Sequence, residues 1–226
     1  VHVLPIPDTN RRPSIDYSAE AREGMKHAGP LAGLLIESML SCAGQVPLPP
    51  NYFLEAASTV RNQGGLLIAD EVQVGFGRVG THMWAFQESG VTPDIVVMGK
   101  PIGNGHPMAA VFTTPEIASS FGDMEFFSTF GGSTVAMAAG LAVLDVLRDE
   151  DLAANARAAG ERLLDGLRAL QAEHELLGDV RGRGLFLGVD LVKDRESRAP
   201  ATEAAQQIKD ALRERRVLIG TDGPFD

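Results

Sequence analysis

The sequence predicts an α/β fold, with a mostly parallel sheet that carries helices on both faces and a smaller α+β domain after it. Residues 31–36, 66–69 and 95–98 are short apolar runs, and glycine or proline stands close to each. Such runs are typical of strands buried on both faces of a parallel sheet. A helix-forming stretch, residues 52–62, separates the first two runs. This β-α-β order predicts right-handed crossover connections.

Local patterns predict the other elements. Asn51 is the candidate N-cap of helix 52–62, and Gly64-Gly65 follows its end. The alanine-rich stretch 134–148 predicts a well-buried helix, and the stretch 151–174 predicts an amphipathic one. Its apolar stripe contains Leu163, Leu167 and Leu170. The further expected elements are a short helix at 84–88, strands at 108–113, 185–192 and 217–219, and a helix at 202–215. We place a domain boundary near Asp149, between a large domain (1–148) and a small C-terminal domain (149–226).

Composition excludes several classes of function. The chain of 226 residues carries a net charge of −10, which argues against nucleic acid as a partner. Its one cysteine, Cys42, rules out an internal disulfide framework and suits a reducing cytoplasm, so we expect a cytoplasmic protein. The histidines show no metal-ligand spacing, and we expect no metal. No apolar run is long enough to span a membrane, and we expect no membrane partner.

Two charged residues directly follow predicted strands. The run 66–69 leads into Asp70, and the run 95–99 leads into Lys100. Parallel strands bring their carboxyl ends to one edge of the sheet, where ligands bind in open α/β folds. A charge at a strand end is most often only a contact with water, so neither residue alone indicates a site. Together, a carboxylate and an amine are the groups that pyridoxal phosphate chemistry requires.

Three motifs add to this pair: DEVQVGFGR from Asp70, MGKPIGNGHP from Met98 and STFGGS from Ser128. In this order they resemble the class III aminotransferases, a family of fold-type-I pyridoxal phosphate enzymes. The resemblance runs over essentially the whole chain and implies the large domain of that fold plus part of its small domain. One departure is Ser133, where the family usually has Asn. The chain resembles the C-terminal half of a family member, so we expect a fragment without the family's upstream phosphate cradle and stacking aromatic residue.

The resemblance also implies roles for individual residues. Lys100 would form the Schiff base with pyridoxal 5'-phosphate, and Asp70 would pair with its pyridine nitrogen. Val72 would lie against the ring, and Gln73 would reach its hydroxyl group. Thr129 would bind the cofactor phosphate of the neighbouring subunit in a homodimer. Glu37, at the end of the first predicted strand, has two open alternatives: a place near the substrate, or a structural cap or ion pair.

Two reactions remain open under this resemblance. In transamination, the substrate would be a small primary amine and the acceptor a keto acid, and the freed Lys100 amine would take a proton from the carbon that bears the substrate nitrogen. The stretches 37–45, 99–107 and 191–195 look most like the ethanolamine-phosphate phospho-lyase branch, which eliminates phosphate and ammonia. A third alternative is a truncated, non-catalytic chain that keeps only the fold.

Two other patterns favour simpler interpretations. Residues 75–80 match G-x-G-x-x-G, but a dinucleotide fingerprint follows its strand at once, opens a helix and precedes a strand with an acidic end. Here four residues intervene after Asp70, and the next predicted strand ends at Lys100. Arg181 and Arg183 stand in a glycine-rich stretch that we interpret as a turn, where a structural role is favoured over binding of an anionic substrate.

Overall fold

A four-stranded sheet forms the centre of the N-terminal part of the chain in the computed structural model, which describes residues 1–122 and 124–225. Its strands are β1 (Gly33–Glu37), β4 (Leu66–Asp70), β5 (Ile95–Met98) and β6 (Ala110–Thr113), in the spatial order β1-β4-β5-β6. The first three are parallel, and β6 runs antiparallel to β5. The predicted mostly parallel sheet is therefore confirmed, with strand bounds that differ by up to two residues.

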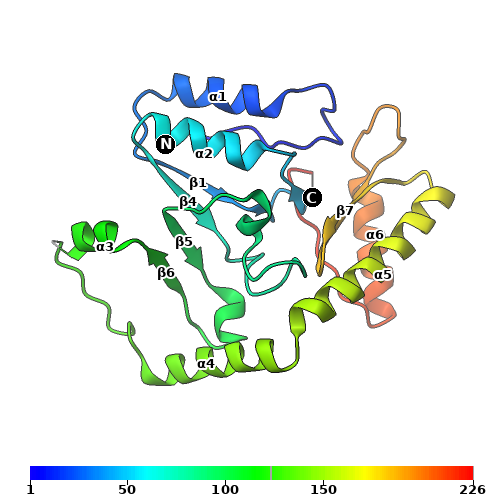
Figure 1. The fold of residues 1–226 in the computed structure, drawn as a ribbon. Helices are drawn as coiled ribbons and strands as arrows, with labels where there is room; N and C mark the ends of the chain where they lie inside the picture. Colours follow the sequence, from blue (N-terminus) through cyan, green and yellow to red (C-terminus); the bar gives the residue numbers. More distant parts are fainter. Residues whose placement is uncertain (123, 226) are drawn as a thin grey trace.

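Helices α1 (Tyr17–His27) and α2 (Tyr52–Asn62) lie side by side along the sheet (Figure 1). Buried residues of both helices pack against Ile36, Leu67 and Ala69 of β1 and β4. Leu35, the neighbour of Ile36 in β1, points to the opposite face of the sheet and is 63% exposed. The bounds of α2 confirm the predicted helix, whereas the sequence analysis missed α1.

Asn51 is the N-cap residue of α2, as predicted, but it does not cap the helix through its side chain. Its φ of 63° is left-handed, and its side chain makes no capping hydrogen bond. By contrast, Asp16 caps α1 by accepting a hydrogen bond from the backbone N–H of Ala19. Asparagine tolerates the left-handed region, so the backbone of Asn51 can form the turn that leads into α2.

Short elements connect the sheet to the C-terminal part of the chain. They are the antiparallel pair β2 (Met39–Leu40) and β3 (Val46–Pro47), the 3-10 helices η1 (Ala85–Ser89) and η2 (Lys100–Gly103), and α3 (Pro115–Gly122). Helix α4 (Thr134–Asp149) then leads into α5 (Leu152–Glu173). Asp151 separates the two helices with a φ of 46°. The break lies close to the predicted domain boundary, which stays a prediction.

The C-terminal part packs α5 and α6 (Thr202–Glu214) with a hairpin of β7 (Leu177–Arg183) and β8 (Phe186–Leu191) (Figure 1). The predicted turn around Arg181 and Arg183 is wrong, because both residues belong to β7. The expected strand 217–219 is also wrong. These residues pair with no strand within the described part of the chain, and Leu218 is 85% exposed.

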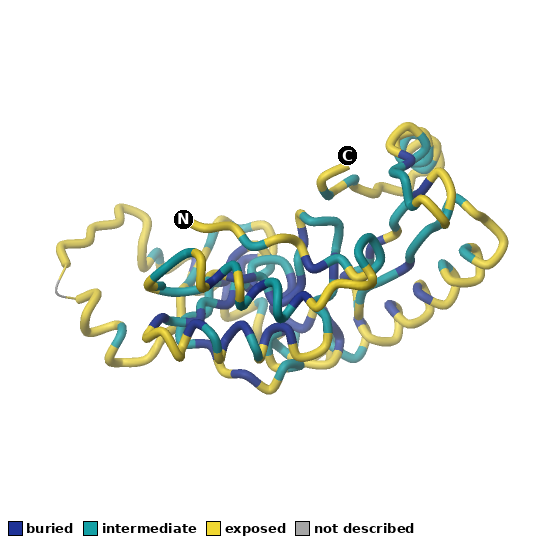
Figure 2. The backbone as a smooth tube through the Cα atoms, turned by 90° about the horizontal axis from the view of Figure 1, so that it is seen from above, coloured by how far each residue is buried: buried dark blue, intermediate teal, exposed yellow. Residues whose placement is uncertain are grey.

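Burial on the two long helices differs from the prediction. On α5, Leu163 and Leu170 are about half exposed, while Ala156, Gly160 and Leu164 are buried. The predicted leucine stripe is thus wrong, because the helix packs through small residues that let another backbone approach. Helix α4 is mostly exposed, and only two of its residues are buried. Figure 2 shows the buried residues concentrated in the middle of the molecule and exposed residues along the α3–α4 segment.

Candidate active site

The carboxyl ends of β1, β4 and β5 meet at one edge of the sheet. Glu37 of β1 pairs in register with Asp70 of β4, and Asp70 pairs with Val97 of β5. Lys100 begins η2 two residues after β5 ends. The parallel strands therefore bring the acidic residue and the lysine to the same edge, as their sequence positions predict.

A pocket of about 450 Å³ opens at this edge. Among the residues predicted from the motifs, Val72, Gln73 and Lys100 line it. The other lining residues are Arg78, Pro101, Asn104, Gly105, Leu185 and Phe186. The volume falls within the range of pockets that hold cofactors and small ligands. No carboxylate lines the pocket among the described residues, so its two cations suit an anionic ligand.

Lys100 has a left-handed backbone, with a φ of 38°. The left-handed region of the backbone costs a non-glycine residue roughly 1–2 kcal/mol, so local stability does not explain why a lysine occupies this position. Its side chain is exposed toward the pocket, and we find no hydrogen bond or ion pair of its amine in the described chain. Gly99 precedes it, and a Cβ at that position would stand 3.6 Å from the Val72 methyl groups. Val72 therefore lies next to the backbone that carries the lysine.

The two acidic residues of the DE pair face different surroundings. Asp70 is half-buried, and its Oδ1 accepts a hydrogen bond from the backbone N–H of Val72 at 2.9 Å. Glu71 is fully buried and accepts hydrogen bonds from Ser38 Oγ and from the backbone N–H groups of Ala85 and Phe86. The sequence analysis did not single out Glu71.

Burial raises the pKa of Glu71, against the opposing effect of these three hydrogen bonds. A carboxyl group whose pKa is higher in the folded than in the unfolded chain stabilises the fold only at low pH. That contribution is present below the ordinary glutamate pKa and is lost as the pH rises through the raised value. Keeping Glu71 ionised near neutral pH therefore lowers the stability of the fold.

The carboxylate of Glu37 accepts hydrogen bonds from a residue close to it in the chain. It accepts hydrogen bonds from the backbone N–H of Ser41 and, at 2.9 Å, from Ser41 Oγ. This geometry favours the structural alternative, a cap of the turn that follows β1. A role toward substrate stays a prediction.

Thr129 lies outside the pocket. It is exposed in the segment before α4, and the described lining residues do not include it. Ser133, the departure from the family pattern, is the N-cap of α4, and its Oγ accepts a hydrogen bond from the Ala136 N–H at 3.4 Å. Serine is among the preferred N-cap residues, so the substitution keeps this helix start. The binding of a neighbouring subunit's cofactor phosphate by Thr129 stays a prediction.

Residues 75–80 form turns, and no helix opens there, in agreement with the rejection of a dinucleotide site. Instead, α5 and the β7–β8 hairpin pack on this segment. A Cβ on Gly80 would lie 2.7 Å from the backbone nitrogen of Arg157 in α5, and Leu185 donates its N–H to the carbonyl of Arg78. These glycines therefore allow close backbone contact, which brings Leu185 and Phe186 to the pocket.

Arg181 and Arg183 are engaged within the chain. Arg181 donates hydrogen bonds to the carbonyl of Gly44 at 2.7 and 3.1 Å and pairs with Asp179 at 3.2 Å. Arg183 forms an ion pair with Glu88. Both contacts agree with the structural role favoured above.

Other kinds of site are not found in the described residues. No group of three or more His, Cys, Asp or Glu side chains there could hold a metal ion. No described helix has the length and apolar character needed to cross a bilayer.

The strand-edge lysine and carboxylate on a mostly parallel sheet agree with the fold-type-I α/β enzymes that the motifs resemble. The sequence matches the Aminotransferase class-III family over residues 1–224, and the chain belongs to that family. Membership implies pyridoxal phosphate as the cofactor.

Three relatives illustrate the range of activities in the family. Alanine--glyoxylate aminotransferase 2-like of Drosophila melanogaster is 43% identical over 100% of this chain and 49% of its own length. Ethanolamine-phosphate phospho-lyase homolog 1 of Caenorhabditis elegans is 48% identical over 86% of this chain and 42% of its own. A phospholyase from Arthrobacter, solved in complex with phosphoethanolamine, is 40% identical with a TM-score of 0.92, over 100% of this chain and 56% of that one. This chain thus spans about half the length of such relatives.

Proposed function

We propose that the full-length protein is a pyridoxal phosphate-dependent enzyme that acts on a small primary amine by transamination through Lys100. The observation that carries this proposal is the backbone of Lys100, which is left-handed and presents the amine to a pocket shared with Val72 and Gln73. Asp70 stands at the same edge of the sheet. These residues fit the cofactor because an amine, an amide and an apolar wall line the pocket, and the Asp70 carboxylate stands at the same edge of the sheet without lining it.

The bound cofactor supplies an electron sink for the bond that breaks next to the substrate nitrogen. Within the chain, the Lys100 amine would hold the cofactor covalently and, once released, would take and return the proton at that carbon. The Asp70 carboxylate would keep a proton on the pyridine nitrogen through a charge-assisted hydrogen bond. Val72 would contact the ring, and Gln73 would bind its hydroxyl group.

A second candidate reaction is elimination of phosphate and ammonia from an amino phosphate such as phosphoethanolamine. The pocket lining suits a phosphate-bearing ligand, because Arg78 joins Lys100 there and no carboxylate does among the described lining residues. The similarity to the Arthrobacter phospholyase also supports it. Lys100 would remove the same proton in both reactions. In elimination, the phosphate leaves from the adjacent carbon, and hydrolysis of the remaining carbon–nitrogen unit releases ammonia and acetaldehyde.

Product analysis of the full-length protein separates the two reactions. If transamination is correct, we expect several primary amines to be consumed only when a keto acid such as pyruvate or 2-oxoglutarate is present. No inorganic phosphate should appear from phosphoethanolamine. Release of phosphate and ammonia without any acceptor would instead establish elimination. The comparison is decisive because transamination leaves the cofactor carrying the amino group after one turnover, whereas elimination regenerates it.

We also propose a homodimer in which Thr129 serves the cofactor phosphate of the neighbouring subunit. The support is a continuous stretch of exposed apolar side chains around Thr129 and on α4, where Phe127 is 84%, Phe130 88% and Val135 67% exposed. Large apolar surfaces of this kind mark interaction sites. We expect Phe127→Glu to lower the sedimentation coefficient of the full-length protein and to weaken cofactor binding on dilution. His174→Glu, on the exposed end of α5, is the control that should change neither.

A further inference from the structure

Glu71 is a buried carboxylate that the proposed reaction does not use. Its side chain is 0% exposed. Oε1 accepts hydrogen bonds from Ser38 Oγ at 2.5 Å and from the Phe86 N–H at 2.9 Å, and Oε2 accepts one from the Ala85 N–H at 2.9 Å. Two of the three partners are backbone N–H groups, which can only donate, so both carboxyl oxygens of Glu71 are held as acceptors by this cage of three donors.

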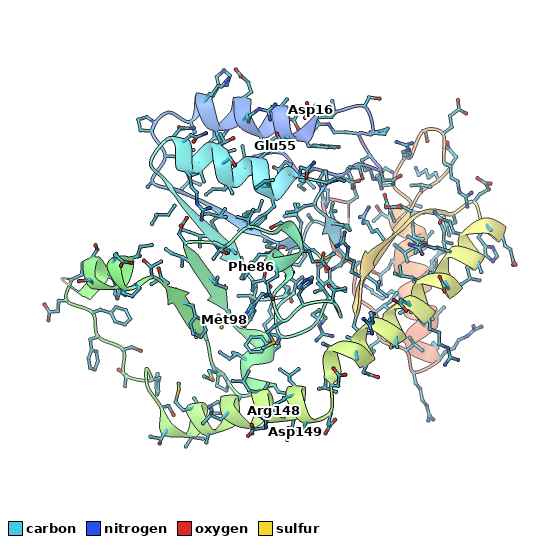
Figure 3. All side chains as sticks on the ribbon, viewed as in Figure 1. Asp16, Glu55, Phe86, Met98, Arg148 and Asp149 are labelled. Atoms are coloured by element: carbon cyan, nitrogen blue, oxygen red, sulfur yellow. The ribbon has the colours of Figure 1, made fainter. Side chains whose placement is uncertain are left out.

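The cage ties together the segments that surround the site. Ser38 directly follows Glu37 at the exit of β1, and Ala85 and Phe86 begin η1. Figure 3 shows Phe86 in the middle of the molecule, close to the strand ends. The backbone of Glu71 is also held on both sides: its N–H donates to the Val97 carbonyl at 2.9 Å, and its carbonyl accepts from the Gly75 N–H at 3.0 Å. The peptide at the end of β4 is therefore fixed through both its backbone and its side chain.

This anchoring bears directly on the preceding residue. Glu71 directly follows β4, and its N–H donates to the Val97 carbonyl as a strand residue would, so its anchored side chain constrains the direction of the Asp70 side chain before it. The hydrogen bond from the Val72 N–H to Asp70 Oδ1 starts the turn that carries Gln73. A buried charge is costly unless every oxygen has donors, and an apolar residue of similar size often stabilises a fold equally well. Stability alone therefore gives no reason for a glutamate here.

We propose that Glu71 is a positioning residue: its three-donor cage fixes the end of β4 so that Asp70 faces the pyridine nitrogen and Val72 and Gln73 line the cofactor pocket. The role rests on the proposed function, because it concerns the same cofactor. It does not depend on whether the reaction is transamination or elimination.

The test is Glu71→Gln in the full-length protein. An amide keeps the size of the side chain but replaces one acceptor oxygen with an NH2 donor. That donor would face either the Ala85 N–H or the Ser38 hydroxyl and the Phe86 N–H, so at least one hydrogen bond would be lost. We expect the dissociation constant for pyridoxal phosphate to rise roughly tenfold or more, as the loss of one hydrogen bond to a charged group suggests. We also expect a shift in the pH at which the absorbance of the bound cofactor changes, since Asp70 is displaced.

Asp94→Asn is the matched control. Asp94 accepts a hydrogen bond from the Leu67 N–H at 2.7 Å and pairs with Arg61 at 3.0 Å, just before β5 and at the opposite edge of the sheet. The Asp94→Asn variant should lower the free energy of unfolding of the cofactor-free protein by about as much as Glu71→Gln does. It should leave the affinity for pyridoxal phosphate and the pH titration of the cofactor absorbance unchanged. Equal effects of the two variants on affinity would overturn the positioning role, as would an unchanged affinity in Glu71→Gln.

Ser38→Ala keeps the test decisive if Glu71→Gln does not fold. It removes one donor from the cage without leaving a donor opposite a donor, and we expect a smaller loss of affinity in the same direction. Unchanged affinity and absorbance in Ser38→Ala would then overturn the proposal. Failure of the unsubstituted protein to bind the cofactor through Lys100 would instead overturn the proposed function. The two failures are therefore distinguishable.

Discussion

Replacing Lys100 by glycine is expected to abolish covalent attachment of pyridoxal phosphate and nearly all turnover, while the cofactor-free fold becomes no less stable. Loss of the proton-transferring amine alone costs roughly 10²–10⁴-fold in rate, and loss of covalent attachment adds to this. The backbone should gain, since a lysine with a φ of 38° pays roughly 1–2 kcal/mol that glycine does not pay. Glycine loses about 0.5–1 kcal/mol through its greater freedom in the unfolded chain. The net change in unfolding free energy is therefore between zero and about 1.5 kcal/mol in favour of the variant.

Lys100→Arg is the matched variant. It keeps the positive charge and the left-handed backbone but cannot form the covalent bond, so it should lose attachment and turnover without the gain in stability. Borohydride reduction followed by peptide mapping measures attachment, and denaturant unfolding of the cofactor-free proteins measures stability. A reduced label on Lys26, Lys193 or Lys209 of the unsubstituted protein would contradict the role of Lys100.

The elements that could be predicted are those whose pattern is local. The apolar runs of β1, β4 and β5 predicted the strands correctly, although burial on both faces was wrong for β1, where Leu35 is 63% exposed. Helix α2 shows its buried stripe in its own sequence. Strand β7 could not be predicted in this way. It contains two glycines and two arginines, and it exists because it pairs with β8 and packs on α5.

The same distinction applies to the candidate site. Lys100 and Asp70 could be placed at one edge from strand order alone, and Val72 and Gln73 follow Asp70 in the chain. Arg78 and Phe186 could not be assigned to the pocket, because their place in it depends on how the hairpin β7–β8 packs against the turn 75–80. Glu71 was missed for a related reason. A buried carboxylate is identified by the groups that donate hydrogen bonds to it, and two of these groups are backbone N–H groups of η1, which the sequence alone does not place near Glu71.

Glycine at two positions holds this packing together. Gly160 in α5 lies against Gly184, at the tip of the hairpin, and a Cβ at position 160 would stand 2.8 Å from the Cα of Gly184 and even closer to its carbonyl group. Gly184 in turn has a φ of 52° and contacts the backbone of Arg78 and Val79. These are backbone contacts, so no side chain can rotate to relieve an added methyl group. The helix, the hairpin tip and the turn next to the pocket would have to separate.

Gly160→Ala is therefore expected to destabilise the protein by about 3 kcal/mol or more, at the upper end of the cost of overpacking, despite the better helix propensity of alanine. Gly166→Ala is the control on the same helix. A Cβ there has nothing within 4 Å, so it should stabilise the fold by roughly 0.8–1 kcal/mol. Because Leu185 and Phe186 line the pocket, Gly160→Ala should also raise the KM for the amine more than it lowers kcat. Denaturant unfolding and steady-state kinetics of the full-length variants measure both effects. Equal unfolding free energies for the two variants would show that α5 does not pack on the hairpin tip through Gly160.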